Sequence, residues 1–105
     1  MPIRHRIALI GLAVASALLS GCGRPADIAG GAALAAETGC VACHGTNGRG
    51  TGPTFPNING QHAGYMYEQL KKYRSGERVN IIMNDQAQQL SNAQMELLAR
   101  YYAAQ

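Results

Sequence analysis

The sequence predicts a small all-α domain with three main helices joined by long loops. Apolar residues recur at three- and four-residue spacings in two stretches, and no stretch alternates between apolar and polar residues as a strand would. Glycine and proline gather between residues 45 and 60, and an irregular segment of that length in a compact domain indicates a functional loop. With 105 residues, the chain is expected to hold a single domain.

The N-terminus has the features of an export signal. A basic head precedes the apolar run Ile7–Leu19. This run is shorter than the roughly 20 residues that cross a bilayer, and it suits the core of a signal peptide. It ends in a pattern that resembles the bacterial lipoprotein box, Leu19-Ser20-Gly21-Cys22. We therefore expect a lipoprotein signal peptide over residues 1–21 and a lipid on Cys22; the alternative is an ordinary signal cleaved near Gly21.

The charge of the chain does not indicate a nucleic-acid partner. Lys and Arg number 9 against 6 Asp and Glu, and the pI is near 9.0, but Arg4 and Arg6 lie in the expected signal peptide. The exported part is therefore close to neutral. It has no Trp and only Phe55 as phenylalanine. A domain this small needs a cofactor, a metal or a disulfide to complete its core.

The exported part is expected to begin with a lipidated tether, residues 22–27. The domain proper is expected over residues 28–105. Its first helix, rich in alanine, is predicted over residues 28–38 with Asp27 as the N-cap.

Two further helices are predicted together with their ends. The second covers residues 62–75, and Gly76 follows it at the position of a C-terminal cap. The third begins after Ser91, which forms a capping box with Gln94. The segment 77–90 between them is expected to be irregular. The buried stripes of the two helices are Met66, Leu70 and Tyr73, and Met95, Leu98 and Tyr102.

The motif Cys40-Val41-Ala42-Cys43-His44 indicates covalent attachment of a haem. Two thiols three positions apart on a tight turn can each bond one of the two vinyl groups of the haem. The next residue, His44, then reaches the iron as proximal ligand. A redox dithiol of the thioredoxin type needs a strand followed by a helix, which this sequence lacks. A zinc site needs further ligands, and His62 is the only other histidine or cysteine after Cys22.

From Gly31 to Gln105 the chain resembles a class I cytochrome c of the small bacterial single-haem type. The resemblance rests on the order of several short motifs. In this sequence they are Cys40–Gly45, Gly48, Gly50, Gly52-Pro53, Phe55-Pro56, Gly60-Gln61, Gln69-Leu70 and Tyr73–Gly76. The resemblance implies a small cytochrome c fold around one covalent haem c, in which the first helix crosses the last near Gly31.

The resemblance also implies how the proximal ligand is oriented. His44 would bind the iron through one ring nitrogen, and a backbone carbonyl would accept the N–H of the other. Pro53 is the expected source of that carbonyl, and Pro56 in the same turn is the alternative.

Met83 is the expected sixth ligand, because the family places its axial methionine between the second and third helices. A thioether paired with histidine favours ferrous iron and raises the reduction potential. Relatives often carry proline just before this methionine, whereas this chain has Ile82. Met66 and Met95 lie on helical stripes and are interpreted as core residues. His62, at the start of a helix, is the competing ligand and is otherwise a solvated capping residue.

Four cations near the end of the second helix have two interpretations each. Arg74 and Arg78 either face the haem propionates or lie at a solvated helix end. Lys71 and Lys72 either form a small basic docking patch or belong to an ordinary exposed face.

These features predict an electron-transfer protein rather than an enzyme. With both axial positions filled, haem iron changes oxidation state without binding a substrate. The expected function is single-electron transfer in a periplasmic or membrane-associated respiratory chain. One alternative is a haem protein with an open sixth position that acts as a gas-binding protein or peroxidase. The other is a fixed haem subunit of one membrane oxidoreductase complex.

The expected location is the periplasmic side of a bacterial membrane, with the lipid on Cys22 as the anchor. Gly23 rather than Asp follows the cysteine, which favours the outer membrane by resemblance to the enteric sorting pattern. The short tether keeps the domain near the bilayer, so membrane-associated redox proteins are the expected donors and acceptors. We expect a monomer and no nucleic-acid partner.

Overall fold

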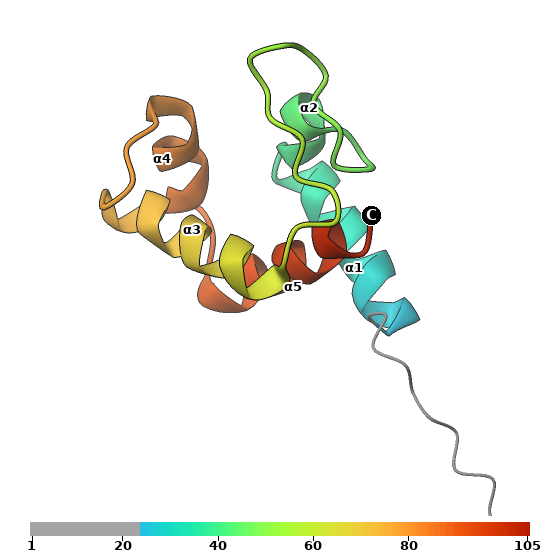
Figure 1. Ribbon diagram of the computed structural model, residues 1–105. Coiled ribbons are helices and arrows are strands. Elements are labelled where there is room, and N and C mark those ends of the chain that lie inside the picture. The colour runs from blue at the N-terminus through green and yellow to red at the C-terminus, as the bar shows by residue number, and fades with distance from the viewer. Residues whose placement is uncertain (1–23) are drawn as a thin grey trace, which may run out of the picture.

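The computed structural model describes residues 24–105, and every regular element in that range is an α-helix. The helices are α1 (Pro25–Glu37), α2 (Cys40–His44), α3 (Ala63–Ser75), α4 (Ile81–Gln88) and α5 (Asn92–Ala103). The long helices α1, α3 and α5 and the loop between α2 and α3 confirm the predicted all-α fold (Figure 1). No helix of residues 24–105 has the length and hydropathy needed to cross a membrane. The predicted signal peptide and Cys22 lie outside the described residues.

α1 begins earlier than the sequence predicted. Pro25 lies in its first turn, where the fixed φ of proline suits a helix and its missing N–H is no loss. Arg24 occupies the cap position, and Asp27 lies inside the first turn with its carboxylate 3.5 Å from Arg24 Nε. A carboxylate is favourable there because the N-terminus of a helix carries a partial positive charge. Residues 25–27, predicted to belong to the tether, are therefore part of α1.

α1 crosses α5 at Gly31, as expected. A Cβ at this position would overlap Tyr101 Cβ and would lie 3.3 Å from the Leu97 carbonyl oxygen, so only glycine permits the approach. α5 packs against both α1 and α3 and supplies most of the core. Its buried residues are Met95, Leu98, Ala99, Tyr101 and Tyr102.

The predicted ends of α3 and α5 are confirmed. α3 ends at Gly76, whose φ of 82° places it in the left-handed region. At the start of α5, Ser91 Oγ accepts the Gln94 amide at 3.1 Å, and Gln94 Oε1 accepts the Ser91 amide at 2.9 Å. Each half of this capping box satisfies a backbone N–H that has no partner within the helix.

α4 lies in the segment that was predicted to be irregular. Asn80 caps it, because its Oδ1 accepts the Met83 amide at 3.0 Å. Asn84 then holds the helix against the end of α3, since its Nδ2 donates to the carbonyl oxygens of Tyr73 and Arg78, both at 2.8 Å. Met83 consequently lies in the first turn of a helix rather than in a loop.

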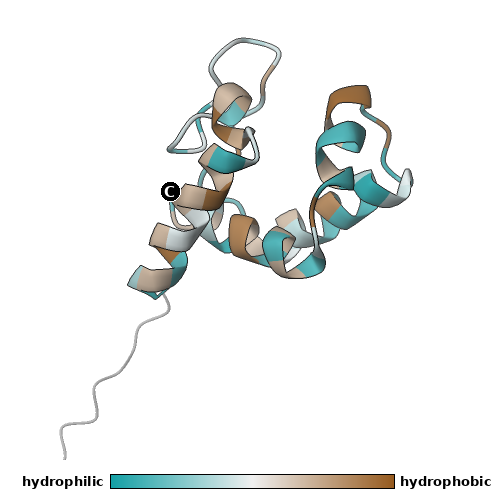
Figure 2. Ribbon diagram, turned by 180° about the vertical axis from the view of Figure 1, so that it is seen from behind, coloured by the Kyte–Doolittle hydropathy of each residue, from teal (hydrophilic) through white to brown (hydrophobic). Residues whose placement is uncertain are grey.

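Two short helices project on the same side of α5 (Figures 1 and 2). We call α2, which follows α1, the α2 arm, and α4, which follows α3, the α4 arm. The hydropathy colouring shows that the turn into α4 is strongly apolar at the tip of its arm (Figure 2). The most exposed large apolar residues of the described chain lie at this tip: Val79 and Ile81 are each 85% exposed.

Candidate functional site

α2 places Cys40, Cys43 and His44 on one short helix. Thr38 and Gly39 end α1 and turn the chain, and α2 begins at the next residue. Both thiols are free and half-buried. The Thr38 hydroxyl lies 3.4 Å from Cys40 Sγ and also donates to the Leu34 carbonyl oxygen at 2.7 Å. The tight turn between α1 and α2 therefore fixes where the first thiol lies.

The loop after α2 orients the His44 ring. Its Nδ1 lies 2.9 Å from the Pro56 carbonyl oxygen. A carbonyl can only accept, so Nδ1 is the donor and Nε2 remains free to bind a metal. The prediction that Pro53 supplies this carbonyl is wrong, and Pro56, the alternative, supplies it.

Backbone hydrogen bonds explain why Pro56 is the acceptor. The Thr51 amide donates to the Cys43 carbonyl oxygen at 2.9 Å, which starts the loop beside α2. A turn then closes between Gly52 and Phe55, with the Phe55 amide 3.0 Å from the Gly52 carbonyl oxygen, and Pro53 lies inside it. The chain leaves the turn at Pro56, and that carbonyl returns to His44.

A cavity of about 520 Å³ is lined by residues of both arms. The α2 arm contributes Cys40, Cys43 and His44, and the α4 arm contributes Ile82 and Met83. The rest of the wall is largely apolar and includes Phe55, Ile58, Met66, Leu70, Leu98 and Tyr102. The structure therefore brings the predicted attachment residues and the predicted sixth ligand to one cavity.

The wall and the donor set of this cavity fit a haem. Two free thiols and an imidazole with a free Nε2 lie on one side of it. Tyr65 and Ile82 line the cavity although they are 50% and 52% exposed. Half-exposed apolar side chains on a concave wall are what a flat apolar group would cover. Such a group would also complete the thin core of this small domain.

Two methionines line the cavity, where the sequence predicted one. Met83 does so from α4, and Met66 does so from α3 while it is only 9% exposed. Met95 is fully buried and lies outside the wall, as expected of a core residue. His62, the competing ligand, does not line the cavity either. Of Met66, Met83, Met95 and His62, only Met66 and Met83 therefore line the cavity.

The sequence did contain an indication that Met66 points towards the interior of the domain. Met66, Leu70 and Tyr73 form the predicted stripe of α3, and all three line the cavity. A helical stripe shows which side chains turn inward, but it does not distinguish a protein neighbour from a cofactor.

Tyr101 and Tyr102 connect α5 to the segment directly after the motif. The Tyr102 hydroxyl donates to the Gly45 carbonyl oxygen at 3.1 Å, and the Tyr101 hydroxyl donates to the Thr46 carbonyl oxygen. Burial raises the pKa of the Tyr102 hydroxyl, so this group remains a neutral donor across the physiological range. The attachment helix is thus held against the main core helix.

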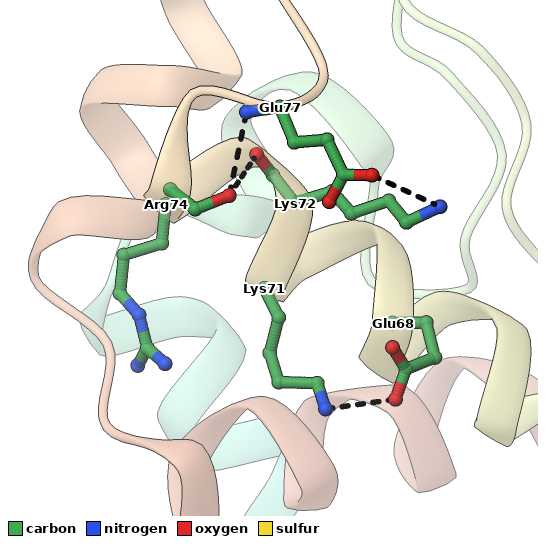
Figure 3. Close-up of a pocket in the computed structure, with 6 residues that line it drawn as sticks. Glu68, Lys71, Lys72, Arg74 and Glu77 are labelled. Atoms are coloured by element: carbon green, nitrogen blue, oxygen red, sulfur yellow. Dashed lines mark hydrogen bonds and ion pairs between the residues drawn. The ribbon is translucent and has the colours of Figure 1, made fainter.

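A second hollow, on the outer face of α3, is charged and open. Figure 3 shows Lys71 and Lys72 each pointing at a carboxylate. Lys71 Nζ lies 2.8 Å from Glu68, and Lys72 Nζ lies 3.9 Å from Glu77. The hydrogen bond to Glu68 raises the pKa of Lys71. Because each lysine has an acidic neighbour, the structure favours an ordinary exposed face over a basic docking patch.

Comparisons with known proteins agree with a haem site in this cavity, because several of the similar proteins are cytochromes. A family model described as cytochrome c matches residues 28–103. Cytochrome c-554(548) of Halomonas halodenitrificans is 44% identical over 69 residues, which cover 63% of this chain and 83% of that protein. The thiosulfate dehydrogenase electron acceptor of Stutzerimonas stutzeri is 40% identical over 67 residues, or 61% of this chain and 31% of that protein.

A solved structure is similar to this fold over most of the chain. The structure of Acidithiobacillus ferrooxidans cytochrome c4 is similar with a TM-score of 0.70 at 34% identity, covering 82% of this chain and 54% of that one. The chain thus spans about half the length of that structure and about a third of the length of the Stutzerimonas relative. At this identity the similarity extends beyond the general arrangement of the helices.

Proposed function

The chain belongs to the cytochrome c family, whose members carry covalent haem c, and on this basis we propose that it is a single-electron carrier with His44 and Met83 as axial ligands. Cys40 and Cys43 would form the two thioether bonds. The observation that carries the proposal is that the motif of α2 and Met83 of α4 line one cavity. The proposed role involves no substrate chemistry by the protein itself.

The residues of the cavity suit this role. The bound haem supplies the one-electron change between ferric and ferrous iron. His44 is held in one tautomer and one orientation by the Pro56 carbonyl, which leaves Nε2 for the iron. The Met83 thioether, as a further ligand, would favour the ferrous state. The largely apolar wall would keep water away from the haem and lower the local dielectric constant. A low dielectric constant favours the ferrous state, because the ferric state carries one more positive charge. The wall would therefore also raise the reduction potential.

Carbon monoxide distinguishes a carrier from an open haem. It binds ferrous iron that has a vacant or weakly held sixth position. We expect the ferrous protein to keep its low-spin spectrum for minutes under carbon monoxide, while denatured protein binds it at once as a positive control. Immediate binding by the native protein would overturn the carrier proposal in favour of a gas-binding or peroxidase function.

We also propose that the carrier is tethered to a membrane on its periplasmic side. The proposal rests on the lipoprotein-like pattern that ends at Cys22, with residues 1–21 as the signal peptide, and the residue after Cys22 favours the outer membrane. Because α1 begins at Pro25, only Gly23 and Arg24 lie between the cysteine and the helix. The haem domain, predicted over residues 28–105 and extended by the first turn of α1, would then stay within about 10 Å of the headgroups.

Redox proteins in or on the membrane are the proposed partners. A similar protein is named for accepting electrons from a dehydrogenase, and the present chain would likewise accept electrons from a dehydrogenase and pass them on. A fixed position in one membrane oxidoreductase complex is the second arrangement compatible with so short a tether. Copurification of solubilised protein distinguishes the two, because a fixed subunit remains in a large stoichiometric complex and a carrier is recovered as a monomer.

A further inference from the structure

The cavity wall contains a single side chain of the lysine, arginine, aspartate and glutamate classes. That side chain is Arg78, at the end of the turn after α3. The other polar residues of the wall carry hydroxyl or amide groups, and no aspartate or glutamate lines the cavity. A haem brings two carboxylates, its propionates, into this space. An isolated carboxylate on an apolar wall is costly unless a cation or several donors meet it.

Arg78 is held in place on both its side chain and its backbone. Its guanidinium donates to Gln69 Oε1 at 2.7 Å and lies over the Tyr73 ring, 4.9 Å from the centroid. Its amide donates to the Lys72 carbonyl oxygen at 3.1 Å, and its own carbonyl accepts Asn84 Nδ2 at 2.8 Å. These contacts fix a long, flexible side chain before any anion arrives.

The charge of Arg78 has no carboxylate partner among residues 24–105. None of the ion pairs found there includes it. Gln69 and Tyr73 are neutral, so they orient the guanidinium without cancelling its charge. A guanidinium has five N–H donors, and the bond to Gln69 uses one of them. Donors therefore remain for a bidentate contact with a carboxylate.

Arg74 is different although it lies on the same helix end. Its guanidinium donates to the Leu90 carbonyl oxygen at 2.9 Å and to Asn92 Oδ1. It does not line the cavity, and in Figure 3 its side chain belongs to the outer charged hollow. Of the two arginines that the sequence could not tell apart, only Arg78 faces the cofactor space.

We propose that Arg78, oriented by Gln69 and Tyr73, pairs with a haem propionate and thereby positions the haem and raises its reduction potential. A charge-assisted Arg–carboxylate pair is shorter and stronger than a neutral hydrogen bond. A positive charge beside the haem disfavours the ferric state, which carries one more positive charge than the ferrous state. Arg78 is thus a positioning residue for the electron-transfer role, and the proposal rests on the covalent haem described above.

Redox titration of the haem-loaded protein tests this with Arg78→Gln and its matched control Arg74→Gln. Both variants remove one positive charge from the same end of α3, but only the first removes it from the cavity wall. We expect Arg78→Gln to lower the potential clearly more than Arg74→Gln does. Equal shifts, or a larger shift in Arg74→Gln, would overturn the proposal.

Two further variants test the same proposal if Arg78→Gln does not fold or does not incorporate haem. Arg78→Lys retains the charge without the guanidinium fork and is expected to give an intermediate potential. Gln69→Glu offers Arg78 a carboxylate within the chain, which competes with the propionate, and is expected to lower the potential with the arginine still present. A wild-type potential in both variants would contradict the proposal. The axial-ligand spectrum, unchanged in all variants, separates failure of this pairing from failure of the carrier proposal.

Discussion

Substitution of Gly31 by alanine tests the helix crossing on which the cavity rests. The added Cβ would overlap Tyr101 Cβ and lie 3.0 Å from its Cγ. The first of these atoms is fixed to the backbone of α5, so a rotamer change cannot relieve the overlap. Steric overpacking of this kind costs about 1–3 kcal/mol, and the rigid neighbour points to the upper end of that range.

Alanine also favours the helix by about 1 kcal/mol relative to glycine, which offsets part of that cost. The expected net loss is about 2 kcal/mol in the free energy of unfolding. For a domain of this size, 1 kcal/mol corresponds to roughly 4–8 °C, so Tm should fall by about 8–16 °C. Guanidinium unfolding of the haem-loaded protein, followed by circular dichroism, measures the free energy directly.

The adjacent glycine is the matched control. A Cβ on Gly30 would meet only Leu97 Cδ2 at 3.7 Å, which is ordinary van der Waals contact. Gly30→Ala should therefore keep the propensity gain of up to about 1 kcal/mol and stabilise the protein. If Gly31→Ala proves as stable as Gly30→Ala, α1 and α5 do not approach each other as closely at Gly31 as the structure shows.

Three further predictions concern the attachment site, the tyrosine contact and the anchor. Cys40→Ala and Cys43→Ala should each weaken or abolish the haem colour retained after denaturing electrophoresis, and haem extracted from the wild type by acidified organic solvent would refute covalent attachment. Tyr102→Phe should cost about 0.5–1.5 kcal/mol at neutral pH through loss of its hydrogen bond to Gly45. Because burial raises the folded-state pKa of Tyr102 above its unfolded value, wild-type stability should fall as pH rises beyond about 10, and titration of the variant should show a smaller fall. Cys22→Ser should release the protein from carbonate-washed membranes, and its retention there would place the anchor elsewhere.

The sequence predicted those features that depend on local chemistry. The α5 capping box needs only Ser91 and Gln94 at the right spacing, and the structure shows both of its hydrogen bonds. The cap at Gly76 and the close approach at Gly31 were likewise predictable, because each needs a residue without a side chain. The motif of α2 was recognisable because attachment through two thioether bonds fixes the spacing between its two cysteines and the histidine that follows them.

Features that depend on tertiary contacts were missed. α4 has a weak apolar pattern, and Asn84 holds it to α3 through bonds to carbonyl oxygens that no local pattern indicates. The choice of Pro56 over Pro53 follows from the path of a loop, which its backbone bonds determine. Met66 looked like a core residue because the core and the cofactor wall are continuous on α3. The start of α1 at Pro25 was predictable from the preference of proline for a first turn, but Asp27 offered a competing signal.

The ferric absorption spectrum of Met83→Ala, compared with that of Met66→Ala, shows directly whether Met83 is the sixth ligand of the haem iron. Both thioethers line the cavity, so the pair is a matched comparison. An iron–sulfur bond gives ferric protein a weak far-red band. We expect Met83→Ala to lose this band, to lower the reduction potential and to admit carbon monoxide. Met66→Ala should keep the band and lose only packing, about 2–5 kcal/mol of stability. A band that survives in Met83→Ala and disappears in Met66→Ala would contradict the assignment of Met83 as the sixth ligand.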